Sequence, residues 1–469
     1  MTARSPSPPP SPPSPLAPAD GGASGAAWWG LAVLILLGLV TYMDRQVIGL
    51  QAEPIRQQLG LDDTGFAMIQ GLSVALFTVL AGYPLGWLAD RFDRRHVLAA
   101  CLLTWCAAVA LCGMSASFLW LFMASGLVGA AEAGLLPIAY AQIPVWFAGS
   151  GRQVANSTFV LLGRLAVGAV IVACGWLIHA IDLWRPFLPA GLQGLPAWRL
   201  ALFATALTGL LLLPLILTLP RARPAGTHPR HATGGSGAAA LPVLRRQAAV
   251  FGSFYLGAGL LAFGASAVGA FVPVAAARAF GATPLAAGQG LGLAALAGAV
   301  SALLATTVLA RRTPLADEPG AGLRLAAWAM ACAAATAPTL LLAEGAGSFF
   351  TLYGLHLACV MTAVMLMPTA LQALCPTTLR ARLMSLYVTA GVALGAGGPL
   401  AVGVLSDAGQ ATASALLLAM VAVAASAHAV AAALLRACAG RCGVAADAGP
   451  GPAGTGARSE ALAATGARP

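Results

Sequence analysis

Long apolar stretches separated by short polar segments make up most of this 469-residue sequence. Each stretch runs for about 18 to 25 residues, the length at which a helix rising about 1.5 Å per residue crosses a hydrocarbon layer of about 30 Å. Membrane β-strands would be shorter and would alternate apolar with polar residues. We therefore predict twelve membrane-spanning helices, near residues 28–50, 65–89, 97–114, 118–140, 155–179, 196–219, 248–274, 284–310, 323–343, 347–369, 381–406 and 411–437.

A polar segment rich in Arg, Pro and Gly, residues 220–247, interrupts this pattern at its centre. Such a composition is typical of a linker, so it divides the chain into two six-helix halves, residues 28–219 and 248–437. The flanking segments, residues 1–27 and 438–469, are expected to be disordered tails. The start has no signal-peptide pattern, so the first span is expected to be retained. An even number of spans places both tails on one side, here the cytoplasm. The predicted fold class is an all-α integral membrane protein.

Composition supports a membrane protein. Hydrophobic residues make up 59% of the chain and charged residues only 9%, a balance that soluble domains do not show. The formal net charge of +10 could suggest nucleic-acid binding, but all 25 basic residues are Arg, and about nineteen of them fall in segments predicted to be cytoplasmic. This positive-inside bias indicates a lipid bilayer, not nucleic acid, as the partner. Four arginines are expected on the outer side: Arg56, Arg185, Arg199 and Arg278.

The sequence offers no chemistry for an enzyme or a bound cofactor. Its nine cysteines are scattered mostly through the apolar stretches, without the spacing of a disulfide framework or a metal site. No catalytic triad pattern, zinc-protease motif or phosphate-binding loop stands out. We therefore expect a protein that is not an enzyme and that holds no metal or cofactor.

A charged motif follows the second predicted span. Gly86, Asp90, Arg91, Arg94 and Arg95 have the spacing G-x-x-x-D-R-x-x-R-R, which resembles the loop signature of the major facilitator superfamily. Asp90 would face a helix N-terminus of the other half, and the arginines would tie neighbouring helix ends, so together they could latch an inner gate. Positive-inside topology alone would explain the arginines but not the Gly and Asp. The second half has only a degenerate counterpart, at residues 309–312.

A closer resemblance lies in the first half. The segments Tyr42-Met-Asp44-Arg45-Gln46, Glu53-Pro-Ile-Arg56, Asp62-Asp63-Thr64 and Gly129-x-x-Glu132, with Gly395-Ala-Gly397-Gly398-Pro399 in the second half, look like Spinster-type bacterial members of that superfamily. The resemblance implies a transporter of twelve helices in two halves. It also implies lipid-like or amphiphilic organic anions as substrates, often coupled to protons.

Two acidic residues, Asp44 and Glu132, lie well inside predicted spans, where charges are costly and mark functional sites. A carboxylate can be neutralised by a proton, which coupling requires, whereas Arg stays charged. Helix rise places Glu132 and Arg164 at similar depth, and Asp44 near Ser125. The resemblance implies Arg at the Ser125 position. We therefore expect Arg164 to replace it as the cation, paired with Glu132, and Asp44 to be the carboxylate that takes up the proton.

Alternatives remain for each of these residues. Glu132 and Arg164 could form a static pair that only holds two helices together, and Asp44 could have a structural hydrogen-bonding role. Arg45, about 100° around the helix from Asp44, is expected to face a neighbouring helix and not the cavity. Polar substrate-binding candidates in the second half are Tyr255, His356 and Tyr387, although a single His in an apolar span is more often a packing residue.

The sequence as a whole predicts a monomeric secondary transporter of a small organic solute in the inner membrane, coupled to protons. A non-transporting sensor on the same fold, a uniporter and an antiporter stay open as alternatives.

Overall fold

The computed structural model describes residues 25–147, 149–220, 247–313, 319–375 and 380–447, and nearly all of them are helical. Within these ranges twelve segments are long and apolar enough to cross a membrane, which confirms the expected number of spans. The helices are α1 (Gly25–Val40), α2 (Met43–Leu50), α3 (Ala52–Leu59), α4 (Asp63–Ala67), η1 (Met68–Ser73), α5 (Val74–Arg91), α6 (Arg94–Met114), α7 (Phe118–Trp146), α8 (Gly149–Trp184), η2 (Arg185–Phe187), α9 (Ala190–Gln193), α10 (Ala197–Leu217), α12 (Ala248–Phe280), α13 (Pro284–Arg312), α14 (Pro319–Thr336), η4 (Ala337–Leu342), α15 (Ala346–Leu374), α16 (Arg380–Gly395), α17 (Gly397–Ala408) and α18 (Ala413–Asp447).

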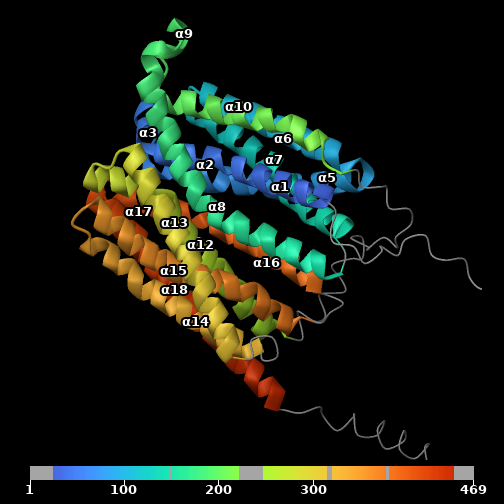
Figure 1. The fold of residues 1–469 in the computed structure, drawn as a ribbon. Helices are drawn as coiled ribbons and strands as arrows, with labels where there is room; N and C mark the ends of the chain where they lie inside the picture. Colours follow the sequence, from blue (N-terminus) through green and yellow to red (C-terminus); the bar gives the residue numbers. More distant parts are fainter. Residues whose placement is uncertain (1–24, 148, 221–246, 314–318, 376–379, 448–469) are drawn as a thin grey trace, which may run out of the picture.

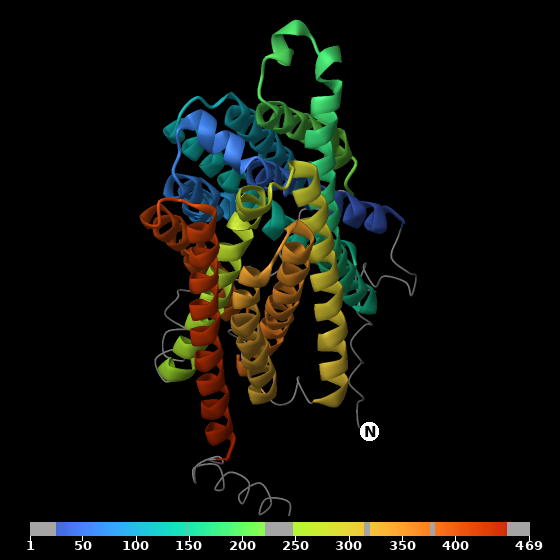
Figure 2. The same cartoon turned by 90° about the vertical axis from the view of Figure 1, so that its left-hand side faces the viewer.

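Two bundles lie side by side, the first built from α1 to α10 and the second from α12 to α18 (Figure 1). Their helices run at an angle to each other and diverge toward the end where α1 begins and α18 finishes (Figure 1). We call this the terminal end and the opposite one the far end. At the far end α8 and α9 project beyond the other helices (Figure 2).

Buried apolar side chains join the two halves toward the far end. One hydrophobic cluster fills the first half and continues into the second, where the Phe66 ring of α4 meets the Phe271 ring of α12 at a centroid distance of 6.1 Å. A second cluster, around Phe254 and Leu435, belongs to the second half alone. Among the described residues, the halves therefore share the first cluster and not the second, which is compatible with a rocking motion of two rigid bodies.

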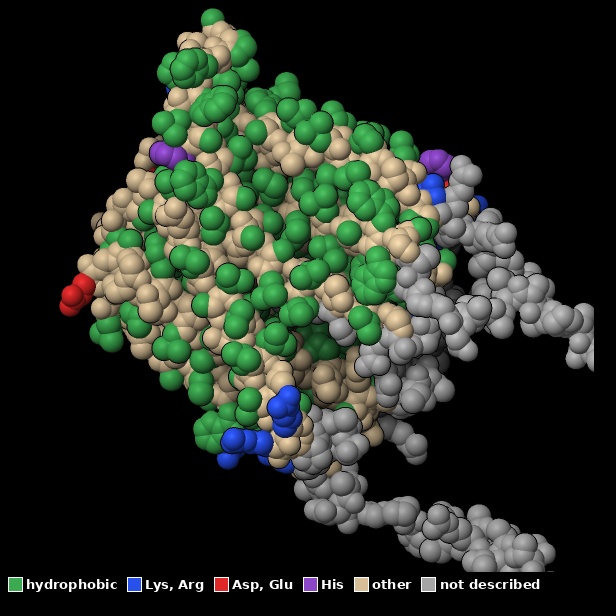
Figure 3. All heavy atoms as spheres, in the orientation of Figure 1, with side chains coloured by type: hydrophobic (Ala, Val, Ile, Leu, Met, Phe, Trp, Pro, Cys, Tyr) green, Lys and Arg blue, Asp and Glu red, His purple; other side chains and the backbone are tan. Residues whose placement is uncertain are grey.

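Hydrophobic side chains cover most of the visible surface (Figure 3). Leu80, Leu211 and Trp328 are each more than 60% exposed, as side chains that face lipid should be. Charged side chains gather at the two ends of the bundle (Figure 3). This distribution is that of a multi-pass membrane protein.

Several of the described spans are irregular, among them the first, the second and the eleventh. The first breaks at Thr41 and Tyr42, between α1 and α2. The second contains the π-helix η1, and the eleventh breaks at Ala396, between α16 and α17. The last two interruptions meet across the halves, because a Cβ placed on Gly71 of η1 would lie 2.9 Å from the Ala396 carbonyl oxygen. Irregular backbone inside a membrane occurs where function needs it.

The longest line of contact between the halves joins α8 and α13, and glycines set its spacing. A Cβ on Gly168 would lie 2.6 Å from the Gly292 carbonyl oxygen, and one on Gly288 would lie 2.8 Å from the Gly175 Cα. Any side chain at these positions would push the helices apart. Small residues at such crossings let membrane helices approach closely and slide.

Some predicted boundaries differ from the observed ones. The last helix continues to Asp447, past the expected end at residue 437. The helix α8 runs to Trp184 and leads into a projecting turn, where Arg185 donates hydrogen bonds to the carbonyls of Gln193 and Leu195. The expected linker, residues 220–247, lies almost wholly outside the described residues.

Candidate functional site

The break in the first span positions two charged residues. Asp44 and Arg45 occupy the first turn of α2, directly after the break. The Asp44 side chain is buried, at 3% exposure, within an apolar span, which is unusual for an acidic residue. A helix that restarts at this point presents its N-terminal amide groups, which favour a negative charge. The break therefore provides the electrostatic environment in which an intramembrane carboxylate can persist.

Arg45 forms an ion pair with Glu132 of α7. This differs from the expected pair of Glu132 with Arg164. The side chain of Arg164 lies outside the described part of α8, so the cation that the structure assigns to Glu132 is Arg45. Arg45 was expected to face a neighbouring helix, and its long side chain does reach across from α2 to α7.

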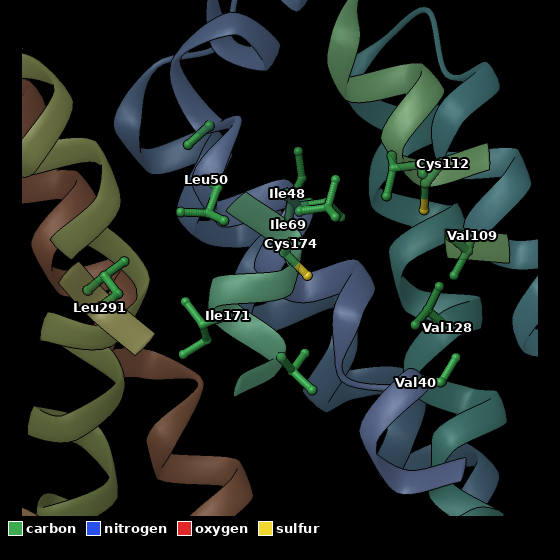
Figure 4. Close-up of a cluster of buried hydrophobic side chains, with 14 of the residues drawn as sticks. Val40, Ile48, Leu50, Ile69, Val109, Cys112, Val128, Ile171, Cys174 and Leu291 are labelled. Carbon is green, nitrogen blue, oxygen red and sulfur yellow. The ribbon is translucent and has the colours of Figure 1, made fainter. Parts of the chain in front are cut away.

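The Asp44 carboxylate is buried, and the charges that act on it are those of Arg45 and Glu132. Val40, Val109, Cys112 and Val128 belong to the buried apolar cluster of the first half (Figure 4). Ser125 is buried as expected, with its Oγ 3.7 Å from the Cys112 Sγ. Among the described residues, Asp44 Oδ1 has no hydrogen-bond partner. A buried oxygen of this kind is costly when charged and is satisfied by a proton, a water or a ligand.

We call Asp44, Arg45 and Glu132 the central triad. It holds two carboxylates and one guanidinium at the heart of the first half. Arg45 Nε also has no hydrogen-bond partner among the described residues. The triad therefore keeps one carboxylate oxygen and one donor available, a combination suited to exchanging a proton and receiving an anion.

A second group of charges joins the halves at the far end. The Arg278 guanidinium, in the last turn of α12, donates to both carboxylate oxygens of Asp63, at 2.7 and 2.9 Å. It also donates to Glu53 of α3, at 2.9 Å. Arg56 completes the network from the first half through ion pairs with Glu53 and Asp63, both at 3.1 Å.

Asp407, at the end of α17, adds a second connection, in which an acidic residue of the second half contacts the first half. Its carboxylate accepts hydrogen bonds from the backbone amides of Asp63 and Thr64, at 3.0 and 2.8 Å, and from the Thr64 hydroxyl. These amides belong to the start of α4, where a carboxylate is favoured. We call Glu53, Arg56, Asp63, Arg278 and Asp407 the far-end cluster.

The charges of the far-end cluster change the pKa of the Glu53 carboxyl, which lies outside the membrane-spanning segments. Partial burial alone would raise the pKa of the Glu53 carboxyl, but the hydrogen bond and charge of Arg278, together with the charge of Arg56, outweigh it. They hold the pKa below its ordinary value. Glu53 is therefore ionised throughout the neutral range, and the connection between the halves is intact there.

The predicted gating motif lies at the terminal end. Arg94 donates to the Ala141 carbonyl of α7 at 3.0 Å, and Arg95 to the Leu217 carbonyl of α10 at 3.3 Å. Arg91 lies over the Trp87 ring, with its Cζ 4.4 Å from the centroid. A Cβ on Gly86 would contact nothing within 4 Å. The Asp90 side chain lies outside the described residues. Arg94 and Arg95 thus connect helix ends within the first half, and the gating role of the motif stays a prediction.

The three second-half candidates do not lie together. Tyr255 donates to the Leu383 carbonyl at 3.0 Å, and Tyr387 lies near it beside the Phe254 ring. His356 is buried elsewhere, with its Nδ1 3.1 Å from the Ala333 carbonyl. Its ring also lies against His428, at a centroid distance of 5.3 Å. This placement supports the packing alternative for His356.

Sequence reasoning missed the far-end cluster. Its members come from three distant parts of the sequence, and 215 residues separate Asp63 from Arg278. A signal was nevertheless present: Arg56 and Arg278 were expected on the outer side, against the positive-inside bias. An arginine on the outer side of the membrane, where arginines are uncommon, suggests a specific acidic partner.

Comparisons with known proteins extend this description. The sequence profile of the Major Facilitator Superfamily matches residues 34–399. An MFS-type efflux pump of Mycolicibacterium smegmatis is 30% identical over 159 residues, covering 34% of this chain and 37% of the pump. Protein spinster homolog 3 of Danio rerio is 30% identical over 212 residues, covering 44% and 38% respectively. Each match thus spans less than two fifths of the relative's own length.

A solved structure resembles the whole fold. It is that of a bacterial homologue of the human lysosomal transporter Spinster, in an inward-facing and unoccupied conformation. The two structures superpose with a TM-score of 0.69 at 24% identity, covering 90% of this chain and 98% of the other. The architecture of two six-helix halves is therefore shared with a known transporter fold.

Proposed function

This chain belongs to the Major Facilitator Superfamily, and on that premise we propose that it is a secondary transporter that moves a small organic solute by alternating access and couples this movement to protons. The family and its structural neighbours are transporters and not enzymes, in agreement with the sequence analysis. The observation that carries the proposal is the central triad, in which Asp44 is buried without a partner for Oδ1 while Arg45 holds Glu132.

The net charge of the central triad in each protonation state determines whether it can bind an anion. With both carboxylates ionised its net charge is negative, so an organic anion is repelled. One proton makes it neutral, and a second leaves the Arg45 guanidinium as the single charge, free to bind a carboxylate or phosphate. Proton uptake therefore creates the anion site, and proton release dismantles it. This logic favours an organic anion or anionic amphiphile as substrate, moving together with protons.

The far-end cluster and the Gly86–Arg95 motif are proposed as the two gates. The far-end cluster holds the halves together in this conformation, and the motif at the terminal end would latch the other side when the halves tilt. Positive-inside topology would place the termini in the cytoplasm of a bacterial inner-membrane protein. The present conformation would then be inward-facing. Gly86, Asp90, Arg91, Arg94 and Arg95 keep this role as a proposal, as do Ser125 and Arg164 at the coupling site.

Proton flux in liposomes tests the coupling. Vesicles that contain the full chain and a luminal pH dye would receive a panel of organic anions, such as glucarate and lysophosphatidate, and solute-driven acidification would be recorded. We expect Asp44→Asn to reduce this signal at least tenfold. Asp182→Asn, which changes an exposed carboxylate at the far end, is the matched control and should behave as wild type. Proton flux that survives Asp44→Asn unchanged would exclude coupling at this residue.

The same vesicles separate the alternatives. Accumulation or counterflow of no solute in the panel would favour a sensor on the same fold. Counterflow that is indifferent to an imposed pH gradient would favour a uniporter or an antiporter that uses other ions.

A further inference from the structure

A groove of about 370 Å³ lies on the outer face of the second half, between the antiparallel helices α14 and α18. Its floor is made of alanines, whose short side chains leave a furrow between the two helices. Arg324 and Trp328 line one wall, and Arg436 lines the other. The floor residues include Ala327, Ala331, Ala432 and Ala433.

The groove sits at one boundary of the apolar belt. A Cβ on Gly320 would lie 3.4 Å from the Ala439 carbonyl oxygen, so the start of α14 lies against the last part of α18. Arg324 is about 6 Å along the helix from the start of its span, and Arg436 about 9 Å from the end of its own, taking a rise of about 1.5 Å per residue. Both guanidinium groups therefore lie within reach of the headgroup layer, at the terminal end.

The side chains point outward and not into the bundle. Arg324 and Arg436 are exposed, and Trp328 is 61% exposed. The Arg436 Cζ lies 5.6 Å from the centroid of the Trp328 ring, which orients the guanidinium over the mouth of the groove. Basic side chains also gather at this end of the molecule in Figure 3, beside hydrophobic surface. Trp is typical of the membrane interface, where its ring is apolar and its N–H is hydrated.

We propose that this groove binds an anionic phospholipid. Its described lining contains two guanidinium groups and no acidic side chain. Arg pairs with phosphate oxygens through parallel hydrogen bonds, and basic pockets between membrane helices are suited to anionic headgroups. The alanine floor continues below the two charges and accepts one acyl chain, while the Trp328 ring packs against the glycerol region. A soluble phosphate would bind the two guanidinium groups alone and would not occupy the alanine floor.

Native mass spectrometry of the purified full chain tests this proposal. Phosphatidylglycerol and phosphatidylcholine would be titrated onto the protein, and bound lipid counted. We expect the double variant Arg324→Gln/Arg436→Gln to lose at least fivefold in affinity for phosphatidylglycerol, with phosphatidylcholine unchanged. The control Arg311→Gln/Arg312→Gln removes the same charge from the exposed end of α13 at the same boundary, and should stay within twofold of wild type.

Equal losses in both double variants would overturn the proposal, since they would show attraction to overall charge. No loss in either would overturn it as well. A second readout avoids charge variants: phosphatidylglycerol with brominated acyl chains should quench tryptophan fluorescence more in wild type than in Trp328→Phe. An identical quenching profile in the two proteins would show that lipid does not occupy the groove. Displacement of the lipid by millimolar inorganic phosphate would show that the charges act without the furrow.

Discussion

Arg278 donates a hydrogen bond from each terminal nitrogen of its guanidinium to the Asp63 carboxylate, across the boundary between the two halves. The Asp63 side chain is fully buried, at 0% exposure, and also accepts a hydrogen bond from Ser406 at 2.6 Å. Two parallel hydrogen bonds between ions fix orientation as well as distance. This side chain at the end of α12 is therefore one of the contacts that fix how the second half meets the first.

Arg278→Gln is expected to destabilise the protein strongly. It leaves the Asp63 carboxylate buried with half of its cationic partners, and loss of one member of a buried ion pair costs about 3–5 kcal/mol. The melting temperature in detergent should fall by several degrees. Arg312→Gln, a charge loss at an exposed position, should leave it unchanged. If Arg278→Gln/Asp63→Asn melts no higher than Arg278→Gln, the carboxylate is not the source of the loss.

Acid should weaken the far-end cluster with a predictable sign. The folded-state pKa of Glu53 lies below the ordinary value of 4.5. Its contribution to stability is therefore complete above that ordinary value and disappears as pH falls through the lowered folded value. Glu53→Gln should melt below wild type at pH 7, and the difference should shrink when melting is measured below about pH 4.5. A difference that is constant from pH 7 to pH 3.5 would contradict this account.

Restoring an arginine at position 125 is expected to impair coupling. Ser125→Arg would bring a permanent charge into the region of Asp44 and hold that carboxylate ionised, so solute-driven proton flux in liposomes should fall about tenfold. The added volume also strains a buried site. Ser125→Gln is similar in length but uncharged, so it isolates the volume effect. Equal flux in the two variants would mean that packing, not charge, is responsible.

The glycine seam between α8 and α13 should be intolerant of even one methyl group. Gly168→Ala would bring its Cβ within 2.6 Å of the Gly292 carbonyl oxygen, so the helices must separate. We expect transport to fall at least fivefold while the protein remains folded. Gly163→Ala, on the same helix and facing open space, is the control. Transport by Gly168→Ala at the Gly163→Ala level would show that the seam has room to adjust.

The sequence predicted the spans and the family, because hydropathy and the motif near Gly86 are local signals. It also identified Asp44 and Glu132, since an acid within an apolar stretch is conspicuous. It did not foresee that Arg45 pairs with Glu132, because the depth estimate treated the first span as a single straight helix. The break at Thr41 and Tyr42 restarts the helix just before Arg45 and changes what that residue can reach.

The far-end cluster was beyond sequence reasoning for a different reason. Nothing local links Arg278 to Glu53 or Asp63, and only the packing of α12 against α3 and α4 brings them together. The four arginines expected on the outer side run against the positive-inside bias. An arginine that runs against this bias indicates that an acidic residue pairs with it.

The placement of the far-end cluster sets an energetic threshold for the transport cycle. Opening that end means separating Asp63 from Arg278 and Asp407 from the start of α4, so these contacts favour the present state. Reversing a population from 99:1 to 1:99 requires about 5.5 kcal/mol of preferential binding to the opposite state. Cargo and protons together must supply that preference. A weakly discriminating compound could therefore occupy the central triad and still never be carried across.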